Sequence, residues 1–387
     1  MSGPETASIM LSAGEASGDL HGATLCRALG ELHPGVRLLG MGGPRMAAAG
    51  VTVIADPTGH AVVGTSEALG RIPALYRVYR RLVRCMSEER PRALVVIDLP
   101  DFNLRLARRA RRAGVPVVYF IPPQLWAWRG GRIRQVARRI DRVLAVLPFE
   151  AKLYEHARVP VQFVGHPLLD VLPLDLGRDE ARRRLRLDPG ATAVGLLPGS
   201  RREEVARLLP PMLSAARQLR SAGAAEHFLL GLAPTIDRRG VDRIIGETAK
   251  EALPSVRVLD GQTYEVMAGA DVIVTASGTA TLETALLGTP MVVCYRVSRV
   301  TEIIVRLLVR VDWCSLPNLV AGRAIVPEIL QDDVTGERLA AETWKLLNDP
   351  VASTAQRAAF KDLRARLGEP GVARRAARAV LEVAGLG

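Results

Sequence analysis

Residues 93–120 read ALVVIDLPDFNLRLARRARRAGVPVVYF. The run Ala93–Ile97 is apolar throughout and has the length of a strand, as expected for a parallel strand that is buried on both faces. A helix over Leu104–Ala113 follows and stops at Gly114, a residue that commonly ends helices. Val115–Phe120 then resumes as a strand. The stretch therefore predicts one strand–helix–strand unit of a parallel sheet.

The same alternation extends in both directions along the chain. Further strands are predicted at 8–12, 36–39, 143–146, 162–164, 193–197, 228–232, 256–259, 272–275 and 291–295, with helices at 20–31, 72–87 and 203–221. The pattern pauses at 167–173, and each half opens with a strand, a Gly turn and a helix. We expect an α/β protein of two Rossmann-like, doubly wound parallel-sheet domains with a cleft between them, covering residues 1–170 and 171–350 and followed by a helical tail over 351–387.

The chain has 387 residues, of which 48% are hydrophobic and 24% charged, and it carries 52 basic against 40 acidic residues, a net charge of +12. Arginines crowd into the segments 77–84, 105–112 and 129–142. Such a basic face favours polyanions, either nucleic acid or an anionic membrane surface, although an Arg-rich proteome would give the same excess. Only 4% of residues are aromatic, and no nucleic-acid-binding motif is present, so the sequence argues against a nucleic-acid partner.

The N-terminal residues MSGPETAS lack the basic region of a secretory signal, and no apolar run reaches the ~18 residues of a membrane-spanning helix. The richest apolar segment, 303–311, is interrupted by two arginines. The four cysteines have neither disulfide nor metal-site spacing, and no histidine has a second histidine or a cysteine at i+3 or i+4. We therefore expect a cytoplasmic protein without a metal site or cofactor.

Two motifs in the first half are candidates for chemistry. In LSAGEASGDLHG (11–22), Gly14 and Gly18 allow a tight turn before a helix whose free N–H groups suit an anion or a sugar, and Asp19 could cap that helix. In VIDLPDFN (96–103), Asp98 and Asp101 follow a buried strand, where open α/β sheets place their ligands. A carboxylate there could act as the general base for a sugar hydroxyl. Helix capping by Asp101 or Asn103 is the structural alternative.

Two motifs in the second half suit phosphate. In LLPGSRREE (196–204) the turn places Ser200, Arg201 and Arg202 at the start of a helix, where backbone N–H groups and a guanidinium form a diphosphate site. In TASGTATLETALLGTP (275–290) a Ser-Gly-Thr turn again precedes a helix, and Glu283 could hold ribose hydroxyls. Together the two turns favour a nucleotide-diphosphate donor.

Ten segments resemble the lipid-A-disaccharide synthase family of inverting GT-B glycosyltransferases. They are SAGEASGD (12–19), GMGGPRM (40–46), IDLPDFN (97–103), WAWR (126–129), LPFE (147–150), FVGHPLLD (163–170), LLPGSR (196–201), ASGTATLE (276–283), SLPNLVAGR (315–323) and VPEILQ (326–331). They are spread in the expected order over nearly the whole chain.

The resemblance implies transfer from UDP-2,3-diacylglucosamine to 2,3-diacylglucosamine 1-phosphate, giving the β-1,6-linked lipid A disaccharide 1-phosphate and UDP without a metal. It implies Asp101 as base with Asp98 beside it, and it leaves a homodimer open. The other implied site residues are, on the donor side, Gly199, Ser200, Arg201, Ser277, Gly278, Thr279, Glu283 and Asn318, and in the acceptor-side loop Gly14, Glu15, Ser17, Gly18 and Asp19.

The implied location is the inner face of the inner membrane, as a peripheral protein. Trp126 and Trp128 stand beside the basic segment 129–142, which suits a membrane-facing rim, although they could equally be core anchors. The chain departs from the family pattern at Arg92, where many members have aspartate, and at Pro122, where a serine is frequent. Another GT-B enzyme, such as a nucleotide-sugar epimerase or a different lipid-linked transferase, and a non-catalytic anionic-lipid-binding protein are the alternatives.

Overall fold

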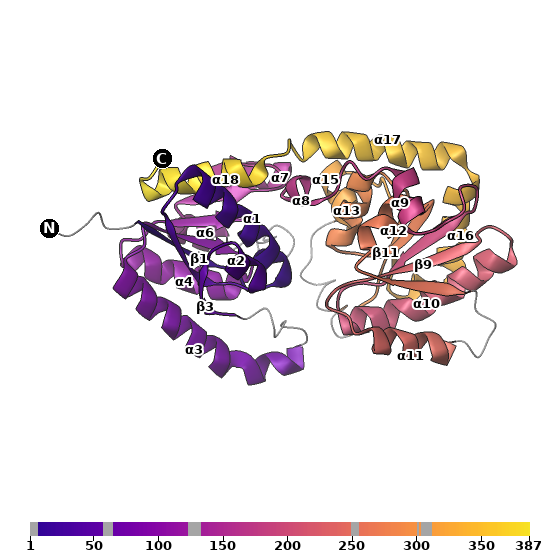
Figure 1. Cartoon of the computed structure of the whole chain (residues 1–387), viewed down its shortest axis with the longest axis horizontal. Helices are drawn as coiled ribbons and strands as arrows, with labels where there is room; N and C mark the ends of the chain where they lie inside the picture. Colours follow the sequence, from indigo (N-terminus) through magenta and orange to yellow (C-terminus); the bar gives the residue numbers. More distant parts are fainter. Residues whose placement is uncertain (1–6, 57–64, 123–132, 249–254, 300–301, 303–311) are drawn as a thin grey trace. The chain divides into compact units, whose positions relative to one another are not determined.

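The computed structural model describes residues 7–56, 65–122, 133–248, 255–299, 302 and 312–387. It divides into two compact units (Figure 1), and each is described by itself. Unit 1 comprises Met1–Asp170 and Leu367–Gly387, and unit 2 comprises Val171–Arg366. The chain therefore passes from one unit to the other twice.

Unit 1 contains a parallel seven-stranded sheet in the order β3-β2-β1-β4-β5-β6-β7. Its strands are β1 (Ser8–Ser12), β2 (Arg37–Met41), β3 (Thr52–Ala55), β4 (Ala93–Ile97), β5 (Val117–Phe120), β6 (Arg142–Ala145) and β7 (Val161–Phe163). The central strands β1, β4 and β5 are buried along their whole length, which explains their uninterrupted apolar sequences. The strand order reverses between β1 and β4, which pair directly, and such a switch point is where open α/β sheets bind their ligands.

Helices cover both faces of this sheet. They are α1 (Ala16–Leu32), α2 (Pro44–Ala48), α3 (Thr65–Glu89), α4 (Pro100–Arg112), α6 (Ile133–Arg139), α7 (Pro148–His156), α8 (Leu168–Val171) and α18 (Val372–Ala384). The last helix of the chain, α18, packs on α1, β4 and β5. On the other face, α3, α4 and α6 share a core with the strands that includes Leu82, Leu106 and Val136. Unit 1 is thus completed by residues from the far end of the sequence.

Unit 2 contains a parallel six-stranded sheet in the order β10-β9-β8-β11-β12-β13. Its strands are β8 (Ala193–Leu197), β9 (His227–Leu232), β10 (Val256–Asp260), β11 (Val272–Ala276), β12 (Met291–Tyr295) and β13 (Glu328–Leu330). Its helices are α9 (Arg178–Arg184), α10 (Arg202–Ser221), α11 (Arg238–Thr248), α12 (Thr263–Gly269), α13 (Thr279–Leu287), α15 (Leu316–Ala321), α16 (Gly336–Asn348) and α17 (Pro350–Arg366), with a 3₁₀ turn at Gln331–Asp333. The order again reverses, here between β8 and β11.

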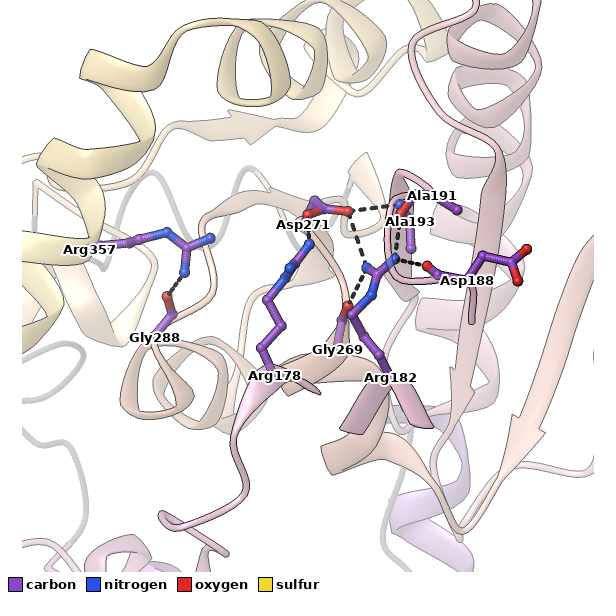
Figure 2. Close-up of polar contacts among 9 residues, drawn as sticks. All are labelled: Arg178, Arg182, Asp188, Ala191, Ala193, Gly269, Asp271, Gly288 and Arg357. Atoms are coloured by element: carbon purple, nitrogen blue, oxygen red, sulfur yellow. Dashed lines mark hydrogen bonds and ion pairs between the residues drawn. The ribbon is translucent and has the colours of Figure 1, made fainter. Parts of the chain in front are cut away.

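An arginine cluster fastens α9 to the amino ends of β8 and β11 (Figure 2). The almost completely buried Arg182 donates to the carbonyls of Gly269, Asp188 and Ala191, and its guanidinium lies 3.6 Å from Asp271. Asp271 also pairs with Arg178 at 2.5 Å and accepts the N–H of Ala193, the first residue of β8. Because these contacts lie at the opposite end of the strands from the Gly turns, we assign the cluster to the stability of unit 2.

The predicted architecture of two doubly wound parallel sheets is therefore confirmed. The strands β3 and β13 were not predicted, and the predicted strand boundaries differ from the observed ones by at most two residues. The helices predicted at 20–31 and 72–87 are longer in the structure, as α1 and α3. The segment expected as a separate tail is helical, but it is divided, because α17 belongs to unit 2 and α18 to unit 1.

Candidate active site

In unit 1 the carboxylate of Asp98 binds the turn after β1. Its Oδ1 accepts the N–H of Gly14 at 2.9 Å, and its Oδ2 accepts the N–H of Glu15 at 3.0 Å. Since β1 and β4 are neighbours, the ends of both strands meet at this point. The N–H groups that the sequence offered to an external anion thus hold a carboxylate of the chain itself.

The glycines of this turn are required by close packing. A Cβ on Gly18 would lie 1.9 Å from Asp98 Oδ2, and a Cβ on Gly14 would lie 1.7 Å from Leu99 Cδ1. Both distances are far below van der Waals contact. Because neither glycine has a side chain, Asp98 and Leu99 can lie close to the start of α1.

The backbone at Asp98 and Leu99 is strained. Both residues have positive φ, 54° and 34°, a region that costs about 1–3 kcal/mol for residues other than glycine. Buried side chains hold the strained segment in place. Asn103 Nδ2 donates to the carbonyls of Ile97 (2.8 Å) and Asp98 (3.0 Å), and the Tyr119 hydroxyl donates to the Asp98 carbonyl at 2.8 Å. The helix α4 begins at Pro100, so Asn103 lies inside it and does not cap it. Its side chain instead holds the backbone that precedes the helix.

The two carboxylates differ in environment. Burial raises the pKa of Asp98 to about 7, against the opposing effect of the N–H groups of Gly14 and Glu15. Asp101 lies in the first turn of α4 and is exposed. A carboxyl whose pKa is close to neutral can exchange protons at working pH, so this strand end is chemically suited to general acid–base work.

A groove of about 790 Å³ begins at these residues. Leu99, Pro100 and Asp101 line one part of it, and the remainder lies among side chains of α3, α4 and α6. Its apolar part includes Tyr76 and Tyr79 of α3 and Phe102 of α4, whose rings contact one another in series. Its basic part consists of arginines, namely Arg105, Arg108, Arg109, Arg112 and Arg139.

Asp19 does not cap its own helix, because α1 begins at Ala16 and Asp19 lies inside it. The carboxylate is buried and accepts the N–H groups of Gly43, Arg45 and Met46 at 2.8–3.0 Å. It thus caps the next helix, α2. Asp19 is thus a structural residue. Glu15 and Ser17, which were predicted with it in the acceptor-side loop, are exposed.

In unit 2 the turn after β8 is held by Glu204. Glu204 accepts the N–H of Ser200 at 3.3 Å and pairs with the guanidinium of Arg201 at 3.1 Å. Gly199 has a φ of +117°, and a Cβ there would lie 2.7 Å from Glu204 Oε2. Arg201 remains about half exposed, so this pair contributes at most about 1 kcal/mol and can readily be exchanged for another anion.

The turn after the neighbouring strand β11 has a similar form. Ser277 donates from its hydroxyl to the Cys314 carbonyl at 2.8 Å, while Gly278 and Thr279 at the start of α13 are exposed. One turn into α13, burial raises the pKa of Glu283 to about 7, and a hydrogen bond with Tyr264 opposes this shift. Because β8 and β11 are adjacent, the two phosphate-suited turns lie side by side at the switch point of unit 2.

Asn318 is completely buried and fully engaged within unit 2. Its Oδ1 accepts the N–H groups of Ile325 and Val326, and its Nδ2 donates to the Val326 carbonyl and to Glu328. Glu328 also accepts from Ser315 and from the N–H of Cys314. The structure thus shows Asn318 holding the loop that contacts Ser277. Neither Glu328 nor Glu204 is predicted as a site residue from the sequence, although Glu204 lies within 196–204 and Glu328 within 326–331.

Comparison with known proteins decides the family. The model of the family described as lipid-A-disaccharide synthetase matches residues 9–383. The chain is 45% identical over 379 residues to the lipid-A-disaccharide synthase of Anaeromyxobacter dehalogenans, covering 98% of each chain. The chain belongs to the lipid-A-disaccharide synthetase family. Its predicted status as an enzyme, a glycosyltransferase of lipid A biosynthesis, is confirmed with it.

Solved structures show the same fold at low identity. The UDP-GlcNAc 2-epimerase of Neisseria meningitidis bound to UDP-GlcNAc matches with a TM-score of 0.65 at 13% identity, covering 97% of this chain and 99% of its own. CalG4, the calicheamicin glycosyltransferase, matches with a TM-score of 0.61 at 15% identity, covering 97% of this chain and 98% of its own. The lipid-A-disaccharide synthetase family thus shares its architecture with GT-B transferases and epimerases.

Some predictions for this family member fall outside the described residues. These are Trp126, Trp128, Arg129 and Arg132 of the basic segment, together with the apolar run 303–311. Among the residues that the structure describes, no helix has both the length and the apolar character needed to cross a membrane.

Proposed function

We propose that this protein is an inverting glycosyltransferase that joins UDP-2,3-diacylglucosamine and 2,3-diacylglucosamine 1-phosphate into the β-1,6-linked disaccharide 1-phosphate. The observation that carries the proposal is the match of the lipid-A-disaccharide synthetase family over residues 9–383. The site geometry supports it, because unit 1 has carboxylates at its switch point and unit 2 has two phosphate-suited turns at its own.

The reaction is a single displacement. The 6-hydroxyl of the acceptor attacks the anomeric carbon of the donor from the side opposite UDP, the bond to UDP breaks, and the configuration inverts. Asp101 accepts the hydroxyl proton, with Asp98 beside it, at the carboxyl end of β4. The strained and internally fastened backbone of Asp98 and Leu99 supports this role, since it fixes the start of α4 and hence the position of Asp101.

On the donor side, negative charge develops on the departing UDP. Arg201, with Ser200, Ser277 and Thr279 around it, would stabilise that charge, and Glu283 would bind the ribose hydroxyls. The exposed pair of Arg201 with Glu204 supports this role, because the guanidinium is already oriented at the end of β8. In this proposal the donor site operates without a metal ion.

The test is incubation of the purified protein with the two substrates. Disaccharide 1-phosphate and UDP should appear in equal amounts, with a β linkage by NMR. Asp101→Asn should lower kcat by ~10²–10⁴-fold while leaving UDP binding intact. Near-normal turnover of that variant would remove Asp101 from the base role, and absence of disaccharide with the wild-type protein would refute the proposal as a whole.

Two further measurements test the donor site. Arg201→Ala should lose more activity than Arg201→Lys, because only the lysine variant keeps a positive charge where the leaving group becomes negative. Excess EDTA should leave the rate unchanged. A strict requirement for added Mg²⁺ would contradict a metal-free donor site.

We also propose that the protein acts as a cytoplasmic, peripheral enzyme on the inner face of the inner membrane, because both substrates carry acyl chains. Vesicles containing anionic lipid should bind the protein reversibly, and high salt should weaken the binding without abolishing it. Charge reversal of Arg129, Arg132 and Arg134 should reduce vesicle binding and spare activity on detergent-dispersed substrate. Failure of the wild-type protein to bind anionic vesicles at low salt would exclude this location.

A further inference from the structure

The groove of unit 1 combines an aromatic surface with a basic one. One part is aromatic, where Tyr76 and Tyr79 stack at 6.5 Å and Tyr79 meets Phe102 edge to face at 6.1 Å. The other part is basic and consists of five arginines, which are called the groove arginines here: Arg105, Arg108, Arg109, Arg112 and Arg139. A ligand that fills such a groove must carry both an apolar portion and an anion.

The groove arginines differ in their partners from the paired arginines Arg37, Arg111 and Arg142 of the same unit. Within the described part of the chain, none of the five forms an ion pair with a carboxylate, and Arg139 donates only to the Leu104 carbonyl at 3.1 Å. On another face of α4, Arg111 pairs with Asp141 at 2.6 Å. Arg142 and Arg37 likewise have carboxylate partners, Glu382 and Glu89. The arginines on the groove side of α4 therefore form no ion pair with a described carboxylate, although Asp101 lies one turn before Arg105 on the same side.

Like charges are also brought together there. Burial lowers the pKa of Arg139, and the neighbouring charge of Arg108 lowers it further. Two guanidinium groups that repel each other are stabilised when a dianion binds between them, and a phosphate monoester can accept from both. The spacing of Asp101, Arg105, Arg108 and Arg112 along α4 keeps all four on one side of the helix.

We propose that this groove binds the acceptor, with Arg108 and Arg139 holding its phosphate and the aromatic side chains of α3 and α4 contacting an acyl chain. The inference rests on the proposed function for the identity of the acceptor. Beyond the proposed function, it names the residues that bind the phosphate of the acceptor and the orientation of the acceptor along α4. Asp101 is separated from Arg108 by about 10 Å along the helix axis, at 1.5 Å per residue. The phosphate thus lies toward the carboxyl end of α4 and the reacting hydroxyl toward its amino end.

The test compares two acceptors on two proteins. The wild-type protein and the double variant Arg108→Gln/Arg139→Gln are assayed in detergent with 2,3-diacylglucosamine 1-phosphate and with the same compound lacking the phosphate. With the phosphorylated acceptor, the variant should show kcat/KM lower by roughly 10- to 100-fold, the value expected for lost hydrogen bonds to a charged group, while the KM for the donor stays unchanged. With the dephosphorylated acceptor, the variant and the wild-type protein should be equal.

The control is Arg111→Gln, which removes an arginine of the same helix away from the groove and should not change acceptor discrimination. An equal loss on both acceptors would overturn the phosphate assignment. So would an unchanged KM for the phosphorylated acceptor combined with weaker binding to phosphatidylglycerol vesicles, because the groove would then be a membrane contact. If the wild-type protein forms no disaccharide from either acceptor, the proposed function itself fails, and the two failures are thus distinguishable.

Discussion

Asn103→Ala tests whether the strained backbone beside the candidate base is held by one buried amide. In the structure Asn103 is completely buried and takes part in four hydrogen bonds. Its Nδ2 donates to the carbonyls of Ile97, Asp98 and Ser12, and its Oδ1 accepts from the Ser12 hydroxyl. The substitution removes all of them and leaves buried carbonyl groups with fewer donors.

The expected cost follows from these contacts. Each lost hydrogen bond contributes about 0.5–1.5 kcal/mol, and an unsatisfied buried group costs about 1–3 kcal/mol, so unit 1 should lose about 3–5 kcal/mol of unfolding free energy. The positive φ at Asp98 and Leu99 would then relax in part, because of the two side chains that hold the Asp98 carbonyl only Tyr119 remains to oppose a strain of about 1–3 kcal/mol per residue. Activity should fall even at temperatures where the variant is folded, since Asp98 and Asp101 move with that segment.

Hydrogen exchange measured by mass spectrometry reports unit 1 separately, through the amides of β1 and β4. Ser12→Ala, which removes a single hydrogen bond, should cost only about 1 kcal/mol. Asn318→Ala is the matched control, because it removes a comparable buried network from unit 2 and should leave β1 and β4 protected. Loss of less than 1 kcal/mol with Asn103→Ala, or unchanged activity of the folded variant, would refute the reasoning.

The folded chain keeps the Asp98 carboxyl protonated up to about pH 7 and the unfolded chain only up to its ordinary value of 3.8, so this group stabilises unit 1 at low pH and its contribution is lost as the pH rises through 7. Because the ionised Asp98 carboxylate holds the backbone beside Asp101, the pH profile of kcat/KM should rise through pH 7 and Asp98→Asn should remove that limb; an unchanged profile in Asp98→Asn would contradict this role. Gly18→Ala should displace the Asp98 carboxylate and cost about 1–3 kcal/mol, whereas Gly30→Ala, on the same helix with open space around it, should stabilise by about 0.4–1 kcal/mol in urea unfolding. Arg182→Leu should lower the unfolding free energy of unit 2 by about 3–5 kcal/mol, because it removes one partner of a buried ion pair. Arg178→Ala, at a half-exposed position, should lower it by less than 1 kcal/mol. Equal losses of the two variants in thermal unfolding would show that burial does not distinguish the two arginines.

The sequence predicts the sheets well because burial on both faces leaves an unmistakable apolar run. Ala93–Ile97, Ala193–Leu197 and Met291–Tyr295 coincide with their strands, since each is a short apolar segment between polar turns. Thr52–Ala55 and Glu328–Leu330 escaped prediction because both are short, lie at an edge of their sheet and are only partly buried. The other two edge strands, Val161–Phe163 and Val256–Asp260, were predicted, so an edge position weakens the apolar pattern without removing it.

For the candidate site, the sequence indicates the position of polar residues along the chain but not their partners. That Asp98 would bind the N–H groups of Gly14 and Glu15 depends on the adjacency of β1 and β4, which a linear pattern does not contain. The same holds for Asp19, which caps a helix more than twenty residues further along. Local capping rules consider only neighbouring residues, and these contacts are tertiary.

The helix α18 has a consequence for how the chain is made. It covers β4 and β5 of unit 1, and Asp170 accepts the N–H of Gly371 across a sequence separation of 201 residues. Unit 2 lies between these positions and is continuous. During synthesis, unit 2 can complete its sheet before α18, the helix that covers β4 and β5, has been made. Unit 1 is therefore completed only after α18 has left the ribosome, and a chain that ends after α17 contains a complete second unit and an incomplete first.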